Sequence, residues 1–440
     1  MAWNRTQMDD WVAGETLQRG VLNQLTRESN PIELKARRRK LIYVWNYKNW
    51  GGAQVYLLAI MKEAKGDWNI VAILPKGSSR DILGFLDQIG IHVEFIDACI
   101  DNGPAPSIKR KLERQWRRIR AEIVTFTYLR KFDLSQSILH IDFAPWQSWI
   151  FFSVLSLLRA NVFVTLHNAL PAFPRWRRLL WTVRMQFISR LSGFHIFTSN
   201  YHAKENVKDL VTKRFWESIK VTYTCVNPNE IAAALNASFD KKLILKQNTI
   251  PNDKFIVLCV GQFIDRKGRW VFLDAAKIIS KESDDIVFVW LTPEMPDAND
   301  LRQIAGYGLG DKFHLLLSSS VGRTRHEILK FFRIANIFAL PSFVDGLPIA
   351  LLEAMALGVP SISTNVYAIP EAIRHRDTGV LIKAGDAHSL AYEILSLKGD
   401  STLRQNLAEK GRRFVLANFD ERVASQIAIA EYKNCFDETT

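Results

Sequence analysis

Short apolar segments recur along most of this chain and alternate with segments that carry helix signals. The apolar segments have the length and composition of β-strands. Strands that alternate with helices are typical of parallel sheets flanked by helices, so the pattern predicts an α/β protein. The predicted strands are 41–46, 70–74, 92–96, 138–141, 162–165, 194–198, 220–223, 255–260, 286–291, 314–317, 337–340 and 361–364.

Chain length and one polar stretch predict two domains. A chain of 440 residues is longer than one ordinary hydrophobic core supports, and its hydrophobic content of 48% suffices for two cores. Residues 227–252 are polar and predict the connection between the domains. The expected parts are an extension over 1–39, α/β domains over 40–235 and 236–418, and a last helix within 419–440.

The most informative segment covers residues 340–360 and follows the predicted strand 337–340. Gly346 can adopt turn conformations that are closed to other residues, and Pro348 suits the first position of a helix. The predicted helix ends at about Leu357, before a glycine and a proline. The first N–H groups of such a helix form a site for polar or anionic ligands.

Two carboxylates flank this helix start. Asp345 lies in the loop beside the free N–H groups, and Glu353 lies inside an otherwise apolar helix. An ionised carboxylate in apolar surroundings is costly unless another group meets it, and a pair of ligand hydroxyls could do so. For two carboxylates alone, an ordinary strand–loop–helix unit with a capping Asp is the simpler explanation.

The loops after two predicted strands of the first domain also carry candidate binding residues, because ligands of open α/β sheets bind beyond the carboxyl ends of strands. Gly51 and Gly52 follow the first predicted strand and let a ligand approach the backbone closely. His167 and Asn168 follow strand 162–165. A lone His more often has a structural role, so spacing alone does not make His167 functional.

The loop 261–268, directly after strand 255–260, combines glycines with the cations Arg266 and Lys267. The point charge of a Lys and the planar fork of an Arg suit a pyrophosphate. A solvated basic turn is the alternative explanation. The sequence does not fix the direction in which Arg266 points.

Taken together, these segments resemble glycosyltransferase family 4, whose members are retaining enzymes of the GT-B fold. The resemblance rests mainly on the run Asp-Gly-Leu-Pro, followed by Glu, Ala, Met, Ala, Gly and Pro, within residues 345–360. It is strong over 255–400, moderate over 41–60 and 160–205, and absent before residue 40. It implies two Rossmann-like domains whose parallel sheets face each other across a cleft, and a last helix that crosses back onto the first domain.

The resemblance also implies roles for individual residues. In this family the first acid contacts the transferred sugar and the second holds the ribose of the nucleotide, which by match are Asp345 and Glu353. His167 would reach the donor sugar, and Lys267 would bind the diphosphate and stabilise its charge as it leaves. His167, Asp345 and Lys267 are therefore the candidate catalytic residues. The further implied donor contacts are Gly51, Gly52, Asn168, Gln262, Arg266, Gly346, Leu347, Pro348 and Ile349.

Two positions depart from the family pattern. The family usually has Glu where this chain has Asp345, and Arg where it has Gln262. The second change removes a positive charge, which Arg266 could supply from the other side of Lys267. Because both positions contact the donor, a non-catalytic, membrane-associated scaffold with a decayed transferase fold stays open as an alternative.

The implied reaction is transfer of a hexose from a nucleotide-diphosphate sugar to an acceptor hydroxyl with retained configuration, in bacterial-type glycan or glycolipid assembly. The second domain would hold the nucleotide, and the first would hold a glycan or lipid-linked acceptor. No Asp-x-Asp-like cluster follows a predicted strand, so neither a metal nor another cofactor is expected. A sugar-nucleotide epimerase of similar shape is the enzymatic alternative, although the run Asp-Gly-Leu-Pro argues against it.

The formal net charge of +13 raises the question of an anionic partner. Much of it lies in 109–120 and 175–190, where cations surround apolar residues or alternate with Trp, as in helices that lie on anionic membranes. Equally, both apolar stripes could face the domain core. Nucleic acid is the least favoured partner, because no recognition motif accompanies the charge. The stripe and the flanking Trp residues are Ile108, Leu112, Trp116, Ile119, Ile123, Phe126, Trp176 and Trp181.

Cysteine usage and the termini predict a cytoplasmic protein, peripheral on the inner face of the cell membrane if the basic segments bind lipid. The four cysteines are far apart and form no metal-binding spacing, which favours reduced structural thiols. Residues 1–10 contain acids and no apolar core, so we expect no signal peptide. The apolar run 146–158 is too short to span a bilayer and predicts a buried helix.

Overall fold

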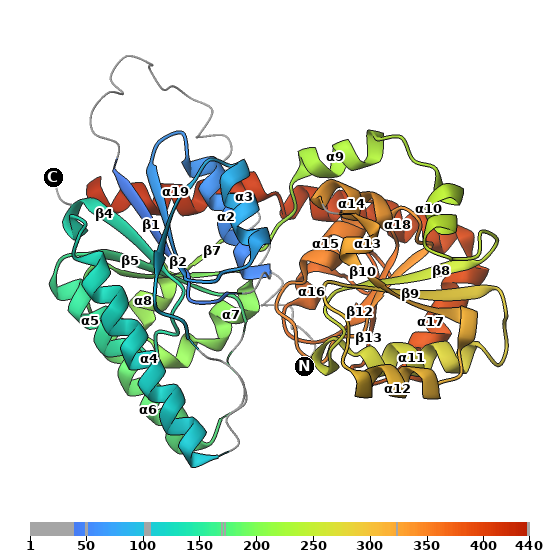
Figure 1. The fold of residues 1–440 in the computed structure, drawn as a ribbon, viewed down its shortest axis with the longest axis horizontal. Coiled ribbons are helices and arrows are strands. Elements are labelled where there is room, and N and C mark those ends of the chain that lie inside the picture. Colours follow the sequence, from blue (N-terminus) through green and yellow to red (C-terminus); the bar gives the residue numbers. More distant parts are fainter. Residues whose placement is uncertain are drawn as a thin grey trace. The chain divides into compact units, whose positions relative to one another are not determined.

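The computed structural model describes residues 39–48, 52–100, 107–168, 170, 173–322 and 324–437. The described chain forms two compact units, each built on one parallel sheet (Figure 1). Unit 1 comprises the described residues up to Thr198, Lys204–Thr222 and those from Arg422 onward, and unit 2 comprises Ser199–Ala203 and Tyr223–Glu421. This architecture confirms the expected fold class of two Rossmann-like α/β domains.

Among the described residues, the sheet of unit 1 has seven strands in the order β3-β2-β1-β4-β5-β6-β7, and all neighbouring strands are parallel. Val44 of β1 lies opposite Ile73 of β2 and Ile141 of β4. The predicted strands of this region are all present, with small differences at their ends. They are β1 (Lys40–Val44), β2 (Asn69–Pro75), β3 (His92–Ile96), β4 (Ser137–Ile141), β5 (Asn161–Leu166), β6 (Phe194–Thr198) and β7 (Lys220–Val221).

Helices cover both faces of this sheet and form two separate apolar cores, because the strands are buried on both sides. The helices of the first face are α2 (Gly52–Ala64), α3 (Arg80–Gln88) and α19 (Glu421–Asp437). Those that contribute to the core on the other face are α4 (Ile108–Leu129), α5 (Trp149–Leu157), α6 (Arg175–Ile188) and α8 (Lys213–Ser218). The short helix α7 (Tyr201–Asn206) lies where the chain passes between the units.

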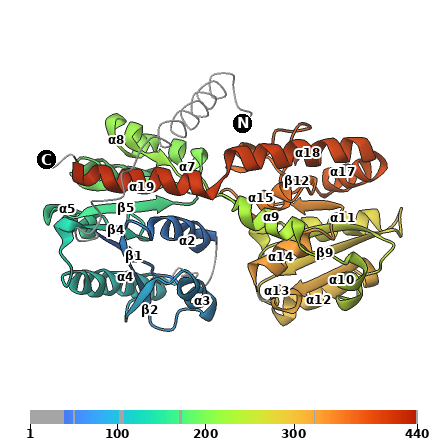
Figure 2. The same ribbon diagram turned by 90° about the horizontal axis from the view of Figure 1, so that it is seen from above.

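The last helix, α19, completes unit 1 although it follows unit 2 in the sequence (Figure 2). Tyr432 is fully buried in the core that α2 and α3 form with the sheet. Its hydroxyl lies 2.6 Å from Nδ1 of His140 and 3.3 Å from the hydroxyl of Tyr43. Residues from the two ends of the chain therefore share one core.

The described sheet of unit 2 has six parallel strands in the order β10-β9-β8-β11-β12-β13. The predicted strands 255–260, 337–340 and 361–364 match the observed bounds of β8, β11 and β12. The sequence analysis missed β13, which is only three residues long. The strands are β8 (Phe255–Val260), β9 (Ile286–Thr292), β10 (Phe313–Leu317), β11 (Ile337–Leu340), β12 (Ser361–Thr364) and β13 (Val380–Ile382).

Helices also flank this sheet, and two of them lie in the polar stretch 227–252 that was expected to be a plain connection. Asn227 caps the first of these, with its side chain accepting two backbone N–H groups, and Pro228 occupies its first turn. The helices are α9 (Pro228–Asn236), α10 (Lys241–Gln247), α11 (Arg269–Ile279), α12 (Ala298–Gly306), α13 (Ser318–Val321), α14 (Arg325–Phe332), α15 (Ile349–Ala356), α16 (Ile369–Ala372), α17 (Ala387–Gly399) and α18 (Ser401–Asn418).

Each sheet has one point where the strand order reverses. In unit 1 this switch point lies between β1 and β4, and in unit 2 between β8 and β11. The connections that follow the two central strands leave in opposite directions, which opens a crevice at their carboxyl ends where ligands of α/β sheets bind. The topology therefore directs attention to the loops after these four strands.

One expectation about the helices of unit 1 is wrong, and one open alternative is decided. The apolar run 146–158 was expected to be a buried helix, but α5 buries only one face and exposes Ile150 and Leu157. Of the two alternatives left open for the apolar stripe of α4, the structure does not show the one that faces the core, because Trp116 is 67% exposed and the helix instead buries Ala121 and Leu129. Across the described residues, no helix combines the length and the apolar composition needed to cross a bilayer.

Candidate active site

The residues after β8 form a tight basic loop at the switch point of unit 2. Asp265–Lys267 make a single 3₁₀ turn, and Gly268 follows with a φ of +76°. A Cβ at Gly268 would lie 1.9 Å from the carbonyl oxygen of Pro341, so the position excludes every other residue. The indole N–H of Trp290 donates a 2.8 Å hydrogen bond to the carbonyl of Gly261 and anchors the start of the loop.

The loop after β11 is tied to this basic loop by backbone hydrogen bonds. The N–H of Phe343 donates to the carbonyl of Arg266 at 2.8 Å. The hydroxyl of Ser342 donates to Oδ2 of Asp345 at 3.2 Å, and the hydroxyl of Thr364 in β12 donates to the carbonyl of Ser342 at 2.6 Å. Three neighbouring strands thus fix the position of the Asp345 carboxylate.

Two cations converge on that carboxylate. The ammonium of Lys267 pairs directly with Asp345, and both side chains are nearly buried. Nη1 of Arg266 lies 3.7 Å from the other carboxylate oxygen, and its Nη2 donates a long 3.4 Å hydrogen bond to Oε1 of Gln262. Arg266 therefore points toward the same place as Lys267, which the sequence left open. The three charged groups sum to a net positive charge.

The start of α15 adds backbone donors beside these charges. Gly346, Leu347 and Pro348 are buried, and Ile349 is the first helical residue. Pro348 is the N-cap and offers no side-chain hydrogen bond, and its carbonyl accepts the N–H groups of Leu351 and Leu352. Within the described residues, the N–H groups of Ile349 and Ala350 therefore have neither a side-chain cap nor an intrahelical partner. A helix start of this kind, next to two cations, favours an anionic ligand.

Glu353 is buried in α15, as expected, but a protein cation already meets it. Nη2 of Arg325 lies 2.7 Å from Oε1 of Glu353, and Nε of Arg325 donates to Glu230 at 2.7 Å. Burial raises the pKa of Glu353, and Arg325 opposes that rise by stabilising the carboxylate. The sequence analysis missed Arg325 and Glu230. The capping box between Thr324 and Glu327 marks the start of α14 and was the available local signal.

The switch point of unit 1 carries polar groups that the sequence analysis also missed. Asn46 follows β1, and Asp142 follows the neighbouring strand β4. The Asn46 amide donates a weak 3.5 Å hydrogen bond to the backbone carbonyl of Asp142. Among the residues that the structure describes, Oδ1 of Asn46 and Oδ2 of Asp142 are buried without a hydrogen-bond partner. Burial raises the pKa of Asp142 to about 7.

His167 lies beside these groups in the topology, because β5 is the next strand of the sheet. Its ring packs edge-on against Tyr56, with 5.3 Å between the ring centroids. Burial lowers the pKa of His167 to about 4, so the imidazole is neutral at pH 7. Asn168 is exposed, and Gly52 is the exposed first residue of α2. Gly51 lies outside the described residues.

The structure thus brings the predicted residues together in two groups. Gln262, Arg266, Lys267 and Asp345 share one cluster of contacts, with the α15 start in the same loop. Glu353 lies deeper in α15 and belongs to a second set of ion pairs. His167, Asn168 and Gly52 belong to unit 1, at the carboxyl edge of its sheet.

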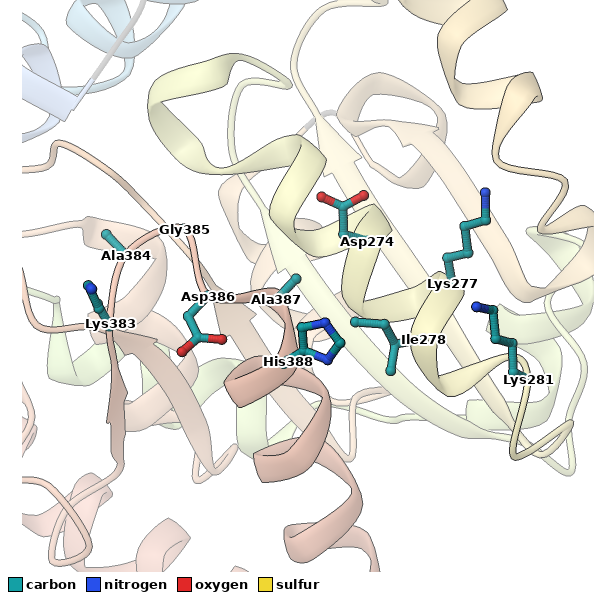
Figure 3. A pocket seen from close by; sticks show the side chains of 10 residues that line it. All are labelled: Asp274, Lys277, Ile278, Lys281, Lys383, Ala384, Gly385, Asp386, Ala387 and His388. Atoms are coloured by element: carbon teal, nitrogen blue, oxygen red, sulfur yellow. The ribbon is translucent and has the colours of Figure 1, made fainter.

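A separate pocket of about 590 Å³ lies between α11 and the loop from β13 to α17 (Figure 3). Its lining mixes the acids Asp274 and Asp386 with three lysines, and His388 lies beside Ile278. Neither Lys267, Asp345 nor Glu353 lines it. The start of α17 also lines this pocket, but the side chain of Asp386 already caps it by accepting the N–H of Ser389. Because its charges are mixed and this helix start is capped, we do not assign the active site to it.

The chain is similar in sequence to several known proteins. Residues 240–414 match the family model described as glycosyl transferases group 1. The chain is 27% identical over 234 residues to the N-acetyl-alpha-D-glucosaminyl L-malate synthase of Bacillus anthracis, covering 51% of this chain and 59% of that protein. It is 28% identical over 202 residues to the UDP-Gal:alpha-D-GlcNAc-diphosphoundecaprenol alpha-1,3-galactosyltransferase of Escherichia coli, covering 46% and 50%. The matched region thus spans little more than half of these curated relatives.

The fold is also that of solved glycosyltransferase structures. The crystal structure of Anabaena HepE in complex with UDP superimposes with a TM-score of 0.68 and covers 90% of this chain and 99% of HepE. The sequence identity is 16%, so this likeness establishes the shared fold alone. The family match, by contrast, covers the loops that contain Lys267, Asp345 and Glu353. The similarity to the glycosyl transferases group 1 family is thus established over residues 240–414, which include these loops.

Proposed function

We propose that this protein is a retaining glycosyltransferase that moves a hexose from a nucleotide-diphosphate sugar to an acceptor hydroxyl. The observation that carries the proposal is the convergence of Lys267 and Arg266 on Asp345 beside the start of α15. Two cations, one carboxylate and free helix N–H groups form a fixed site for a diphosphate. The UDP-bound state of Anabaena HepE, which has the same fold, supports a nucleotide ligand.

In the proposed reaction, the bond between the anomeric carbon and the diphosphate oxygen breaks, and a bond to the acceptor oxygen forms on the same face. The proton of the acceptor hydroxyl passes to the departing diphosphate. Lys267 and Arg266 stabilise the negative charge that develops on that diphosphate, a contribution of about 10²–10³ in rate for one such group. The carboxylate of Asp345, which is positioned by a hydrogen bond from the Ser342 hydroxyl, accepts hydrogen bonds from hydroxyls of the transferred sugar. We expect the reaction to need no metal ion.

Glu353 is proposed to hold the ribose of the nucleotide. Its carboxylate can accept hydrogen bonds from two ribose hydroxyls, and the charge of Arg325 opposes the rise in the pKa of Glu353 that burial causes. Glu230 in turn holds the Arg325 side chain. The ion pair therefore orients the Glu353 carboxylate and does not compete with the nucleotide for every oxygen.

The switch point of unit 1 is proposed to receive the acceptor. The buried Asn46 and Asp142 oxygens lack a described donor, and the neutral His167 imidazole has one nitrogen that donates a hydrogen bond and one that accepts. Hydroxyl groups of a glycan supply the missing donors. The E. coli relative is named for a diphosphoundecaprenol substrate, which supports a lipid-linked acceptor in bacterial-type glycan assembly as the first choice.

Thermal stabilisation by nucleotides, measured in the presence of a chelator, tests the donor site directly. A protein that binds UDP, GDP or ADP sugars at 100 times Kd gains about 2.7 kcal/mol of stability. We expect one base to stabilise strongly with no added metal. Absence of stabilisation by all three, or strict dependence on a divalent ion, contradicts the proposed site.

Product analysis then separates the proposed function from its alternatives. Incubation of the preferred donor with lipid-linked and soluble glycans should yield free nucleoside diphosphate and an α-linked product from an α-linked donor. Conversion of the donor to its epimer without acceptor identifies an epimerase. Donor binding with neither hydrolysis nor transfer across an acceptor panel identifies a non-catalytic scaffold.

A further inference from the structure

The outer surface of α4, α5 and α6 exposes apolar side chains that a folded unit ordinarily buries. All three helices pack on the same face of the unit 1 sheet, so their outward sides belong to one surface of that unit (Figure 1). We call this surface the apolar face. Trp116 is 67% exposed and Trp176 65%. Its large exposed residues are Ile108, Leu112, Trp116, Ile119, Ile123, Ile150, Val154, Leu157, Leu158, Trp176, Leu179, Leu180, Val183 and Phe187.

A groove of about 510 Å³ opens between α4 and α6 within this face. Four arginines line it, namely Arg114 and Arg118 of α4 and Arg177 and Arg184 of α6, and no acid is among its described lining residues. Trp176 and Leu180 form part of the same wall. The groove therefore combines a concentrated positive charge with an apolar rim.

The positive charges of the neighbouring groove arginines repel one another, and a bound anion would reduce this repulsion. Burial lowers the pKa of Arg118. The positive charges of Arg184 and Arg114 also lower this pKa, whereas the negative charge of its partner Glu122 raises it. Nε of Arg118 is buried and lies 3.5 Å from Oε1 of Glu122, but among the described residues it makes no hydrogen bond, and neither does the buried Nε1 of Trp146. Trp146 stacks on the groove residue Trp181, with 5.2 Å between ring centroids. The unpaired buried groups are thus hydrogen-bond donors, which require an acceptor.

We infer that the apolar face is a docking surface for an anionic lipid bilayer, with the arginine groove receiving the phosphate of a lipid headgroup. Arg fits a phosphate through two parallel hydrogen bonds, and exposed Trp and aliphatic residues insert at the boundary between headgroups and acyl chains. Charge complementarity favours this occupant over a second copy of the chain, because two such surfaces would bring eight groove arginines together.

Vesicle sedimentation with matched charge variants tests this inference. The full chain is mixed with vesicles of phosphatidylcholine alone or with an equal part of phosphatidylglycerol, at low and at high salt. We expect binding only to the anionic vesicles, and weaker binding at high salt because salt screens the charges. Each cation near such a surface contributes about 1 kcal/mol, so Arg114→Glu with Arg177→Glu should weaken binding at least about thirtyfold.

The control variant carries Lys242→Glu with Lys246→Glu on α10, which gives the same change in net charge on unit 2. It should bind like the wild type. A second test variant, Trp116→Ser with Trp176→Ser, should lose the binding that resists salt. All variants should keep the nucleotide-induced stabilisation of unit 2, which shows that they fold and separates this inference from the proposed catalytic function.

Four results would overturn the inference. The first is wild-type protein that ignores anionic vesicles at low salt or binds neutral vesicles as well. The second is an equal loss in the α10 control. The third is stabilisation by inorganic phosphate alone that disappears in the Arg114 and Arg177 variant, which would identify a soluble anion as the ligand. The fourth is a dimer in light scattering that the double Trp variant converts to a monomer.

Discussion

The two switch points of this protein are built in opposite ways. At the β8 and β11 loops of unit 2, every charged side chain described above meets an opposite charge, as Lys267 meets Asp345. At the β1 and β4 loops of unit 1, buried oxygens of Asn46 and Asp142 face no described donor. The same topology thus holds an ion-paired site with a net positive charge in one unit and unpaired acceptors in the other.

This difference indicates which kind of ligand each site would bind. In unit 2 the ion pairs fix the geometry in advance, and a diphosphate gains two oriented cations without reorganisation of the loops. In unit 1 each buried polar group without a partner costs about 1–3 kcal/mol, which a hydroxyl-rich ligand recovers when it binds. Burial raises the pKa of Asp142 to about 7, so this carboxyl group holds its proton up to about that pH.

The largest expected effect, a loss of stability, comes from removing Arg325, the cation that pairs with two carboxylates in unit 2. Arg325→Ala leaves Glu353 and Glu230 without their shared partner, and the loss of one member of a buried pair costs about 3–5 kcal/mol. Chemical denaturation followed by a probe in unit 2 measures this loss. The double variant Arg325→Ala with Glu353→Gln should recover part of it, because no charge then stays buried in α15. Equal stability of wild type and Arg325→Ala would show that the pair is not energetically coupled.

Loss of the diphosphate cation should affect activity more than stability. Lys267→Ala should lower kcat by about 10²–10³-fold and reduce stabilisation by the nucleoside diphosphate. Lys277→Ala provides the matched control, because Lys277 lies on the adjoining helix α11 and lines the separate pocket of Figure 3. The assignment of the site to the β8 loop is wrong if the two substitutions have the same effect.

A moderate effect is expected for the ribose contact. Glu353→Gln keeps the size of the side chain but removes the charge that Arg325 meets, so it should weaken donor binding and raise the KM for the donor more than the KM for the acceptor. Titration calorimetry with the preferred nucleoside diphosphate measures the change. Wild-type affinity in this variant would mean that Glu353 serves only the internal ion pair.

The smallest expected effect is a pH dependence that belongs to unit 1. Asp142 has a folded pKa of about 7, well above its ordinary pKa of 3.8, so the unfolded chain releases this proton first as the pH rises. Its contribution therefore lowers the stability of the folded protein progressively between about pH 4 and pH 7. Asp142→Asn removes this contribution, and the stability of the variant relative to wild type should rise across that window and then level off.

Several groups titrate in the same range, so only the difference between the two proteins is informative. Glu371 also has a pKa raised to about 7 by burial, whereas burial lowers the pKa of His140 to about 3 and of His167 to about 4. These residues are present in both proteins and cancel in the comparison. A constant difference from pH 4 to pH 8 would show that Asp142 does not titrate there.

The sequence by itself determined the parts of the site that depend on neighbours along the chain. Strand period, turn glycines and helix starts are local properties, and they placed β8, β11 and the beginning of α15 close to their observed bounds. The position of Gly268 after a basic turn and of Asp345 before a helix start follows from the same local rules. These rules also gave the α/β class, because alternation of strands and helices needs no knowledge of strand order.

Only the tertiary structure decided which of these local pieces meet. The sheet order makes β1 and β4 neighbours, so Asn46 and Asp142 lie together although 96 positions separate them. Arg325 reaches Glu353 from another helix. Tyr432, near the other end of the sequence, packs into a core whose other residues come from several separate segments of the chain. The sequence also left open whether the apolar stripe of α4 faces the sheet or the solvent. The helical period of the apolar residues is the same in both cases.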